Sequence, residues 1–179
     1  MKLGGWKINP VVGAMPQKVA TAFSEAAETL VGASYEPICY LGSQVANGTN
    51  HAVVAKQTLV IPGAKANVVI MKFNEKGMDC HLYAIEPIIE DGGRFGGYVV
   101  DPKVGDDIDE NALKSFTDVT AGWCGVAIHP VALLASKVVK GINLTFLCSV
   151  TGIYPGAEAE AKLVTVNGLT KTIDFEDIL

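Results

Sequence analysis

The chain of 179 residues contains two stretches that match each other at a fixed offset of 93 positions. Residues 31–74 align with residues 124–167 over 44 positions without a gap. The identical pairs include Gly32/Gly125, Pro37/Pro130, Ser43/Ser136, Val45/Val138, Gly48/Gly141, Asn50/Asn143, Pro62/Pro155, Gly63/Gly156, Ala64/Ala157, Ala66/Ala159 and Asn74/Asn167. These pairs are a quarter of the window, whereas unrelated segments match at roughly one position in fifteen. We therefore interpret the chain as an internal duplication.

The duplication predicts two domains, residues 1–90 and 96–179, joined by a linker at 91–95. Upstream, Gly4-Gly5-Trp6 matches Gly96-Gly97-Tyr98 at an offset of 92, which places one inserted residue between the arm and the helix. Each unit is long enough to bury a core of its own. Hydrophobic residues make up 49% of the chain and charged residues 18%, which indicates a globular protein.

Hydrophobic periodicity predicts one helix followed by four strands in each unit. In the first unit we expect an extended segment at 6–12, a helix at 16–31 and strands at 37–46, 49–61, 67–73 and 80–88. In the second we expect a helix at 108–122, begun by Asp107 with Glu110, and strands at 131–139, 143–150, 160–166 and 172–175. The predicted class is therefore α+β, with each helix packed on a curled antiparallel sheet of four to five strands.

Asn47-Gly48 is the strongest turn signal in the first unit. A type I′ turn needs positive φ at both central residues, which glycine accepts freely and asparagine more readily than most residues. We therefore predict a hairpin with Gln44 to Gly48 at an exposed tip. The second unit carries its counterpart at Lys137 to Gly141.

The net charge of −5 argues against a nucleic-acid partner and against an anionic membrane, because both need concentrated Lys and Arg. Acidic clusters lie at residues 106–110 and 174–177. The four cysteines, Cys39, Cys80, Cys124 and Cys148, occupy non-equivalent positions in the two copies, so we predict free thiols. Free thiols favour the cytoplasm slightly, but the localisation stays open, and the opening segment lacks the apolar core of a signal peptide.

No pattern in the sequence indicates catalysis, a metal site or a cofactor. His51, His81 and His129 have no metal-ligand spacing, and none of them recurs in the other copy. Cys80 and His81 are adjacent on a predicted strand, so their side chains should point to opposite faces. The glycine pairs do not stand in the order of a phosphate-binding loop.

A glycine-containing arm, one long helix and then a strand that ends in Gln44-Val45-Ala46-Asn47-Gly48-Thr49-Asn50 resembles the cystatins and stefins. Their hairpin carries a Gln-x-Val-x-Gly motif, often continued by Thr-Asn. The chain is more similar still to bacterial proteins of uncharacterised role with a GGW, YEP and QVVAGTNY-like arrangement. The resemblance implies two tandem cystatin-like units.

The resemblance implies a non-catalytic inhibitor that occludes the cleft of papain-like cysteine proteases. The implied contact residues are Gly4, Gly5, Gln44, Val45, Ala46, Asn47 and Gly48, with second-copy equivalents Gly96, Gly97, Lys137, Val138, Val139, Lys140 and Gly141. Three departures weaken this expectation: Ala46 replaces the central Val, Lys137 replaces Gln, and neither 74–79 nor 167–171 contains the Pro-Trp of the family. The alternatives are a non-inhibitory interaction or scaffold module, and a small-molecule carrier that uses the concave sheet face.

Overall fold

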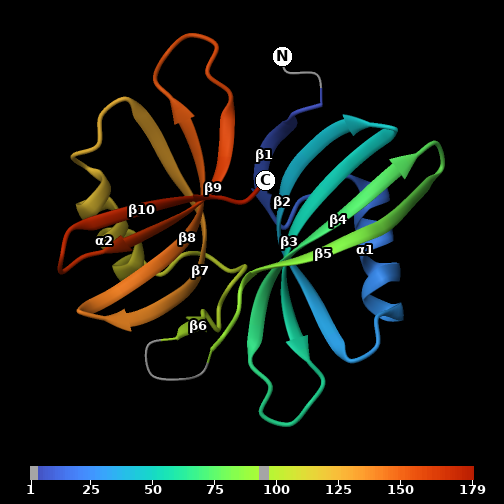
Figure 1. The fold of residues 1–179 in the computed structure, drawn as a ribbon, viewed down its shortest axis with the longest axis horizontal. Coiled ribbons are helices and arrows are strands. Elements are labelled where there is room, and N and C mark those ends of the chain that lie inside the picture. Colours follow the sequence, from blue (N-terminus) through green and yellow to red (C-terminus); the bar gives the residue numbers. More distant parts are fainter. Residues whose placement is uncertain (1–3, 93–96) are drawn as a thin grey trace. The chain divides into compact units, whose positions relative to one another are not determined.

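The computed structural model describes residues 4–92 and 97–179, and the chain divides into two compact units at Glu90. Figure 1 labels the elements of both units. The predicted linker at 91–95 and the predicted arm residue Gly96 fall largely outside the described residues.

Unit 1 is a five-stranded antiparallel sheet in the order β1-β2-β3-β4-β5, with one helix between the first two strands (Figure 1). Its elements are β1 (Trp6–Val12), α1 (Gln17–Thr29), β2 (Ala33–Ala46), β3 (Gly48–Leu59), β4 (Ala66–Lys76) and β5 (Asp79–Ile89). The extended segment predicted at 6–12 is confirmed as β1. Pro87 lies on β5, an edge strand, which is the place in a sheet where proline is best tolerated.

Unit 2 has the same order of elements and a five-stranded antiparallel sheet in the order β10-β9-β8-β7-β6. Its elements are β6 (Tyr98–Val100), α2 (Glu110–Thr120), β7 (Val126–Val139), β8 (Gly141–Gly152), β9 (Ala159–Asn167) and β10 (Thr172–Asp177). The helix begins two residues later than the predicted 108, because Asp109 rather than Asp107 is its cap: the Asp109 carboxylate accepts hydrogen bonds from the Asn111 and Ala112 amides at 2.9 and 3.3 Å.

The long hairpins of the two units share one register. The β2–β3 pairing shifts after Pro37 and again after Tyr40, and the β7–β8 pairing shifts after Pro130 and again after Leu133. Both shifts are therefore reproduced at the offset of 93 that the aligned residues show.

The first strands of the two units differ in length and in the residue that the next strand places opposite them. At Gly42, a Cβ would lie 2.1 Å from the Lys7 carbonyl oxygen of β1, so glycine permits the close approach of that strand. The equivalent residue in unit 2 is Ala135, and β6 is only 3 residues long against 7 in β1.

Each unit has a core between its helix and one face of its sheet. In unit 1, Phe23 of α1 meets Phe73 of β4 with ring centroids 6.1 Å apart, and in unit 2 Phe116 of α2 meets Phe146 of β8 at 4.9 Å. The buried members are Val19, Ala22, Phe23, Val53, Ala55, Val69, Met71 and Phe73 in unit 1, and Ala112, Phe116, Val119, Phe146, Cys148, Val150, Val164 and Val166 in unit 2.

The predicted α+β class of two helix-on-sheet units is wrong. Strands form 56% of the chain and helices 14%, so the protein is mostly β, with two five-stranded antiparallel sheets and two short helices. The physical reason lies in the strands, which carry apolar residues on both faces rather than on alternate positions only. Thus Val53 and Ala55 face α1, while Ala52 and Val54 between them are also fully buried.

The type I′ turn predicted at Asn47-Gly48 is also corrected. Gly48 has φ of 102°, but Asn47 is not among the residues with positive φ. Only Asn47 separates β2 from β3, and Ala46 pairs directly with Gly48. The tip itself is exposed from Val45 to Asn47, while Gln44 and Gly48 are half-buried.

Candidate protein-binding surface

A chain of amide hydrogen bonds crosses one end of unit 1. Gln44 Nε2 donates to the Gly4 carbonyl at 2.6 Å, and Gln44 Oε1 accepts from Asn50 Nδ2 at 3.0 Å. Asn74 Nδ2 continues the chain, because it donates to Asn50 Oδ1 at 2.7 Å and approaches the Asn47 carbonyl at 3.4 Å. The chain joins the arm, the β2–β3 tip and the start of the β4–β5 turn. We call Gly4, Gly5, residues 44–48 and residues 75–78 the unit 1 hairpin end.

Gly48 brings the two turns of the unit 1 hairpin end together. A Cβ at this position would lie 2.3 Å from the Glu75 carbonyl oxygen and 3.4 Å from Lys76 Cβ. Glycine is therefore required by close backbone approach as well as by its positive φ.

Two apolar side chains project from the unit 1 hairpin end. Val45 is 78% exposed at the β2–β3 tip, and Met78 is 90% exposed in the β4–β5 turn. Exposed aliphatic side chains on adjacent turns are a feature of interaction surfaces. Met78 thus occupies the turn in which the cystatin resemblance leads one to expect Pro-Trp.

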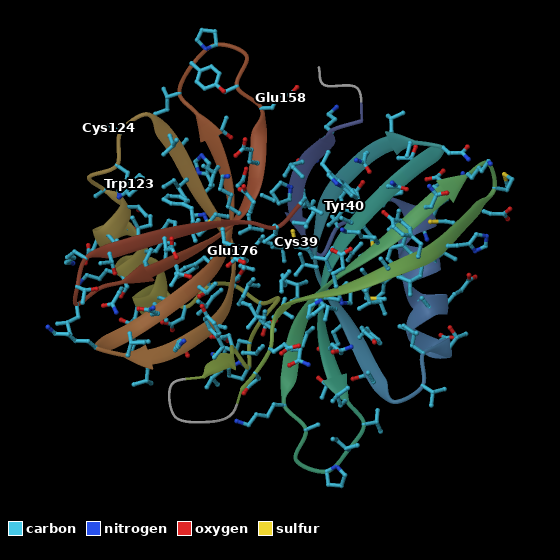
Figure 2. All side chains as sticks on the ribbon, viewed as in Figure 1. Cys39, Tyr40, Trp123, Cys124, Glu158 and Glu176 are labelled. Carbon is cyan, nitrogen blue, oxygen red and sulfur yellow. The ribbon has the colours of Figure 1, made fainter. Side chains whose placement is uncertain are left out.

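A polar network lies behind the unit 1 hairpin end. Tyr40 Oη is 2.9 Å from His51 Nδ1, and His51 Nε2 is 3.2 Å from Glu75 Oε2 (Tyr40 is labelled in Figure 2). Lys18 of α1 donates to Glu75 Oε1 and to the Gly77 carbonyl, both at 2.7 Å. His51 is 5% exposed, so the network is partly buried and ties the helix to the β4–β5 turn.

The electrostatics of this network suit a structural role. The Lys18 ammonium, through its hydrogen bond, holds the pKa of the Glu75 carboxyl below its ordinary value. Burial raises the pKa of the Tyr40 phenol, so the phenol stays protonated and is not an activated nucleophile.

Sequence reasoning missed the network because Lys18, Tyr40, His51 and Glu75 meet only through the pairing of strands. One signal in the sequence marks them in retrospect. At the offset of 93, the second copy has Asn111, Leu133, Leu144 and Gly168, so every member is replaced together. Leu133 and Leu144, which are equivalent to Tyr40 and His51 of unit 1, pack against the unit 2 core.

Unit 2 keeps only part of the amide chain. Asn167 Nδ2 donates to Asn143 Oδ1 at 2.7 Å and to the Lys140 carbonyl at 3.1 Å. Lys137, which replaces Gln44, has its ammonium 5.2 Å from the centroid of the Tyr98 ring. Gly97 precedes β6 directly, so the structure describes no arm contact like that of Gly4.

The remaining candidate groups do not gather into a reactive site. His81 and His129 are exposed, and Cys80 packs on the unit 1 core while its neighbour His81 faces solvent, as the strand periodicity predicts. Burial raises the pKa of the Cys39 thiol to about 12 and raises that of Cys148 as well. Within residues 4–92 and 97–179, no group of three or more His, Cys, Asp or Glu could hold a metal ion.

All four cysteines are thiols in the structure, with Cys39 and Cys148 buried and Cys124 exposed. Figure 2 labels Cys39 in unit 1 and Cys124 in unit 2. The face of each sheet that meets the helix packs against it through the core side chains. No helix in the described part of the chain has the length and apolar character to cross a membrane.

Comparison with protein-family models, with curated proteins and with solved structures found no match to this chain.

Proposed function

We propose that the chain is a non-catalytic protein-binding protein whose unit 1 hairpin end occludes the active-site cleft of a papain-like cysteine protease. The observation that carries the proposal is the amide chain from Gly4 through Gln44, Asn50 and Asn74 to Asn47. It gathers the arm and both turns into one surface before any partner binds. A preorganised surface loses less conformational entropy on binding, which favours affinity.

Occlusion needs no reactive group in the chain. The arm at Gly4 and Gly5 would lie along the cleft while Val45 and Ala46 enter beside the nucleophile. The tight turn at Asn47 and Gly48 presents no extended peptide bond to the enzyme, so it is not cleaved. Cystatin-type inhibition, which the sequence motif suggests, works in this way.

The expected inhibition is weaker than that of a full-motif cystatin. A tryptophan buried in an interface is commonly worth about 2 kcal/mol or more, a factor of roughly 30 in affinity. Met78 offers a smaller apolar surface in its place, and Ala46 offers less than valine. The missing Pro-Trp also favours the second candidate, a non-inhibitory interaction or scaffold module.

The test is steady-state inhibition of several papain-like proteases by the full chain, with Val45→Asp and Val138→Asp as a matched pair. Both valines are exposed, at 78% and 69%, and occupy equivalent positions, so neither change disturbs a core. We expect Val45→Asp to weaken inhibition at least tenfold, because it places a charge on the contact surface. Val138→Asp should leave inhibition unchanged.

Two results contradict the proposal. If the full chain at high micromolar concentration inhibits none of the enzymes, the inhibitor proposal is wrong and the non-inhibitory scaffold module takes its place. If Val138→Asp abolishes inhibition and Val45→Asp does not, unit 2 rather than unit 1 carries the activity. Circular dichroism of each variant verifies that the fold is intact.

A further inference from the structure

The corresponding end of unit 2 carries a second exposed surface with different chemistry. Four aliphatic side chains project there: Val138, Val139, Ile142 and Leu169 are 69%, 43%, 54% and 67% exposed. We call residues 137–142 with residues 169–171 the unit 2 hairpin end. Buried aliphatic surface is favourable by its area, so four exposed chains in one place indicate an interaction site.

The four side chains belong to one continuous tip. Val138 and Ile142 are direct cross-strand partners at the end of the β7–β8 hairpin. Leu169, in the β9–β10 turn, lies against Gly141, where an added Cβ would be 2.9 Å from Leu169 Cβ. Asn167 locks the two turns together through its hydrogen bond to the Lys140 carbonyl at 3.1 Å.

Lysines flank this tip. Lys137, Lys140 and Lys171 form no ion pair with a described residue, although Lys137 lies over the Tyr98 ring. By contrast, Lys162 at the far end of the β9–β10 pair is bound to both Glu160 and Asp177. The lysines that lack a carboxylate partner in unit 2 thus include the three beside the aliphatic tip.

We propose that the unit 2 hairpin end docks on a phospholipid bilayer that contains anionic lipids. The aliphatic chains would enter the interfacial region, and the three lysines would contact the headgroups. This goes beyond the proposed protease contact and uses the other unit.

Three observations favour lipid over protein as the occupant. The apolar side chains stand on projecting turns rather than in a groove, and a fluid bilayer accepts such a tip without a matching cavity. The tip carries neither Arg nor an aromatic residue, the types enriched where proteins bind each other, while Lys is depleted in those interfaces. Unpaired lysines complement anionic headgroups.

The net charge of −5 counts against an anionic membrane only at long range. At physiological ionic strength, charges separated by more than about 8 Å are largely screened from one another. The charges that touch the surface therefore decide docking, and at this tip they are lysines. The sequence-based expectation of no membrane partner rested on the net charge, on the acidic clusters and on the lack of concentrated Lys and Arg, whereas the three lysines of this tip come together only in the folded unit.

The test is flotation of the full chain with phosphatidylcholine vesicles, with and without phosphatidylserine. The key variant carries Val139→Ala, Lys140→Asn and Ile142→Thr, which are the residues that unit 1 has at the equivalent positions 46, 47 and 49. The same hairpin register in unit 1 shows that the fold tolerates them. Lys162→Gln, which removes the same charge far from the tip, is the control.

We expect wild type to float with phosphatidylserine vesicles and the triple variant to lose at least tenfold in partitioning. Lys140→Asn alone should lose about fivefold, the effect of one basic residue at an anionic surface. Lys162→Gln should behave as wild type. The proposal is overturned if the wild type does not float, or if Lys162→Gln loses as much partitioning as the tip variants. The tip would then be a protein contact or a nonfunctional surface. Protease inhibition is measured separately, so either proposal can fail alone.

Discussion

Gly48 is the residue on which the geometry of the unit 1 hairpin end depends most. Its φ of 102° and the approach of the Glu75 carbonyl leave no room for any side chain. The motif residue that the sequence marked as a turn therefore has a second role, in the contact between two hairpins. Substitutions at Gly48 test stability, whereas substitutions at Val45 test binding.

We expect Gly48→Ala to lower the free energy of unfolding by about 1–3 kcal/mol, because alanine is strained at positive φ and its methyl group would collide with backbone. Urea denaturation of the full chain measures the change. Gly122→Ala is the control, since Gly122 has open space around it and no positive φ. We expect that variant to stay within about 0.5 kcal/mol of wild type. Equal effects of the two substitutions would show that Gly48 is not under steric constraint.

At the scale of elements, the units differ in how the helix contacts the turn between the last two strands, which is the β4–β5 turn in unit 1 and the β9–β10 turn in unit 2. In unit 1 this contact is made by hydrogen bonds among Lys18, Glu75 and His51. In unit 2 the positions equivalent to Tyr40 and His51 are Leu133 and Leu144, which pack against the core. Replacement of a buried polar group by a well-packed apolar one is often neutral or stabilising. Compared with leucines at these positions, the polar network therefore fixes the β4–β5 turn beside Gly48 without adding stability, although removal of one partner still destabilises because the others are left unpaired.

Glu75→Gln should change how stability depends on pH. The pKa of the Glu75 carboxyl is lowered in the folded protein, chiefly by Lys18, so its contribution is present above the ordinary carboxyl pKa. That contribution is lost as the pH falls through the lowered value. We expect wild type to lose stability in this acidic range and Glu75→Gln to start lower at neutral pH and lose less. Urea midpoints from neutral to acidic pH measure this.

Glu86→Gln is the matched control, because Glu86 forms an ion pair with Lys72 on the same two strands, β4 and β5, at 2.7 Å. It should keep the acid dependence of the wild type. If Glu75→Gln and Glu86→Gln give the same pH profile, the network has no special effect on the fold.

At the scale of the whole molecule, the units share element order and hairpin register but present different chemistry at their hairpin ends. Unit 1 has amides and two exposed apolar side chains, while unit 2 has four aliphatic side chains with three lysines. We propose that a duplication produced both and that their ends then diverged. The protein would hold a protease with one unit and a lipid surface with the other.

This division of roles predicts one protease molecule per chain. In the described residues, the Gly4 arm of unit 1 is hydrogen-bonded to its tip, and that tip at Val45 to Asn47 is uncharged, whereas the tip of unit 2 carries Lys137 and Lys140, so unit 2 should not occupy a second cleft. Isothermal titration calorimetry or native mass spectrometry of the complex measures the ratio. A ratio of two proteases per chain would mean that Lys137 and Lys140 are compatible with the cleft.

Turns and strands were predictable from local signals. Pro62-Gly63 lies in the turn between β3 and β4, as predicted, and Trp6 to Val12 form the predicted strand. Both signals are local, because glycine, proline and alternating apolar residues influence the backbone only within a few positions of themselves. The exposed tip at Val45 to Asn47 followed from the same reasoning. The conformation of Asn47 did not, because the strands pair up to Ala46 and Gly48 and leave Asn47 as the single residue between them.

The sequence by itself determined where the chain turns and which segments repeat, since both are properties of residues close together or of direct comparison between copies. Only the tertiary structure decided how far the strands extend, to 56% of the chain, because apolar residues on both faces of a strand reveal their role only when the strands pair. It also decided that Tyr40, His51, Glu75 and Lys18 form one network and that the lysines of unit 2 gather at an aliphatic tip. These residues lie far apart along the chain, and no local preference brings them together; the register of the sheets does.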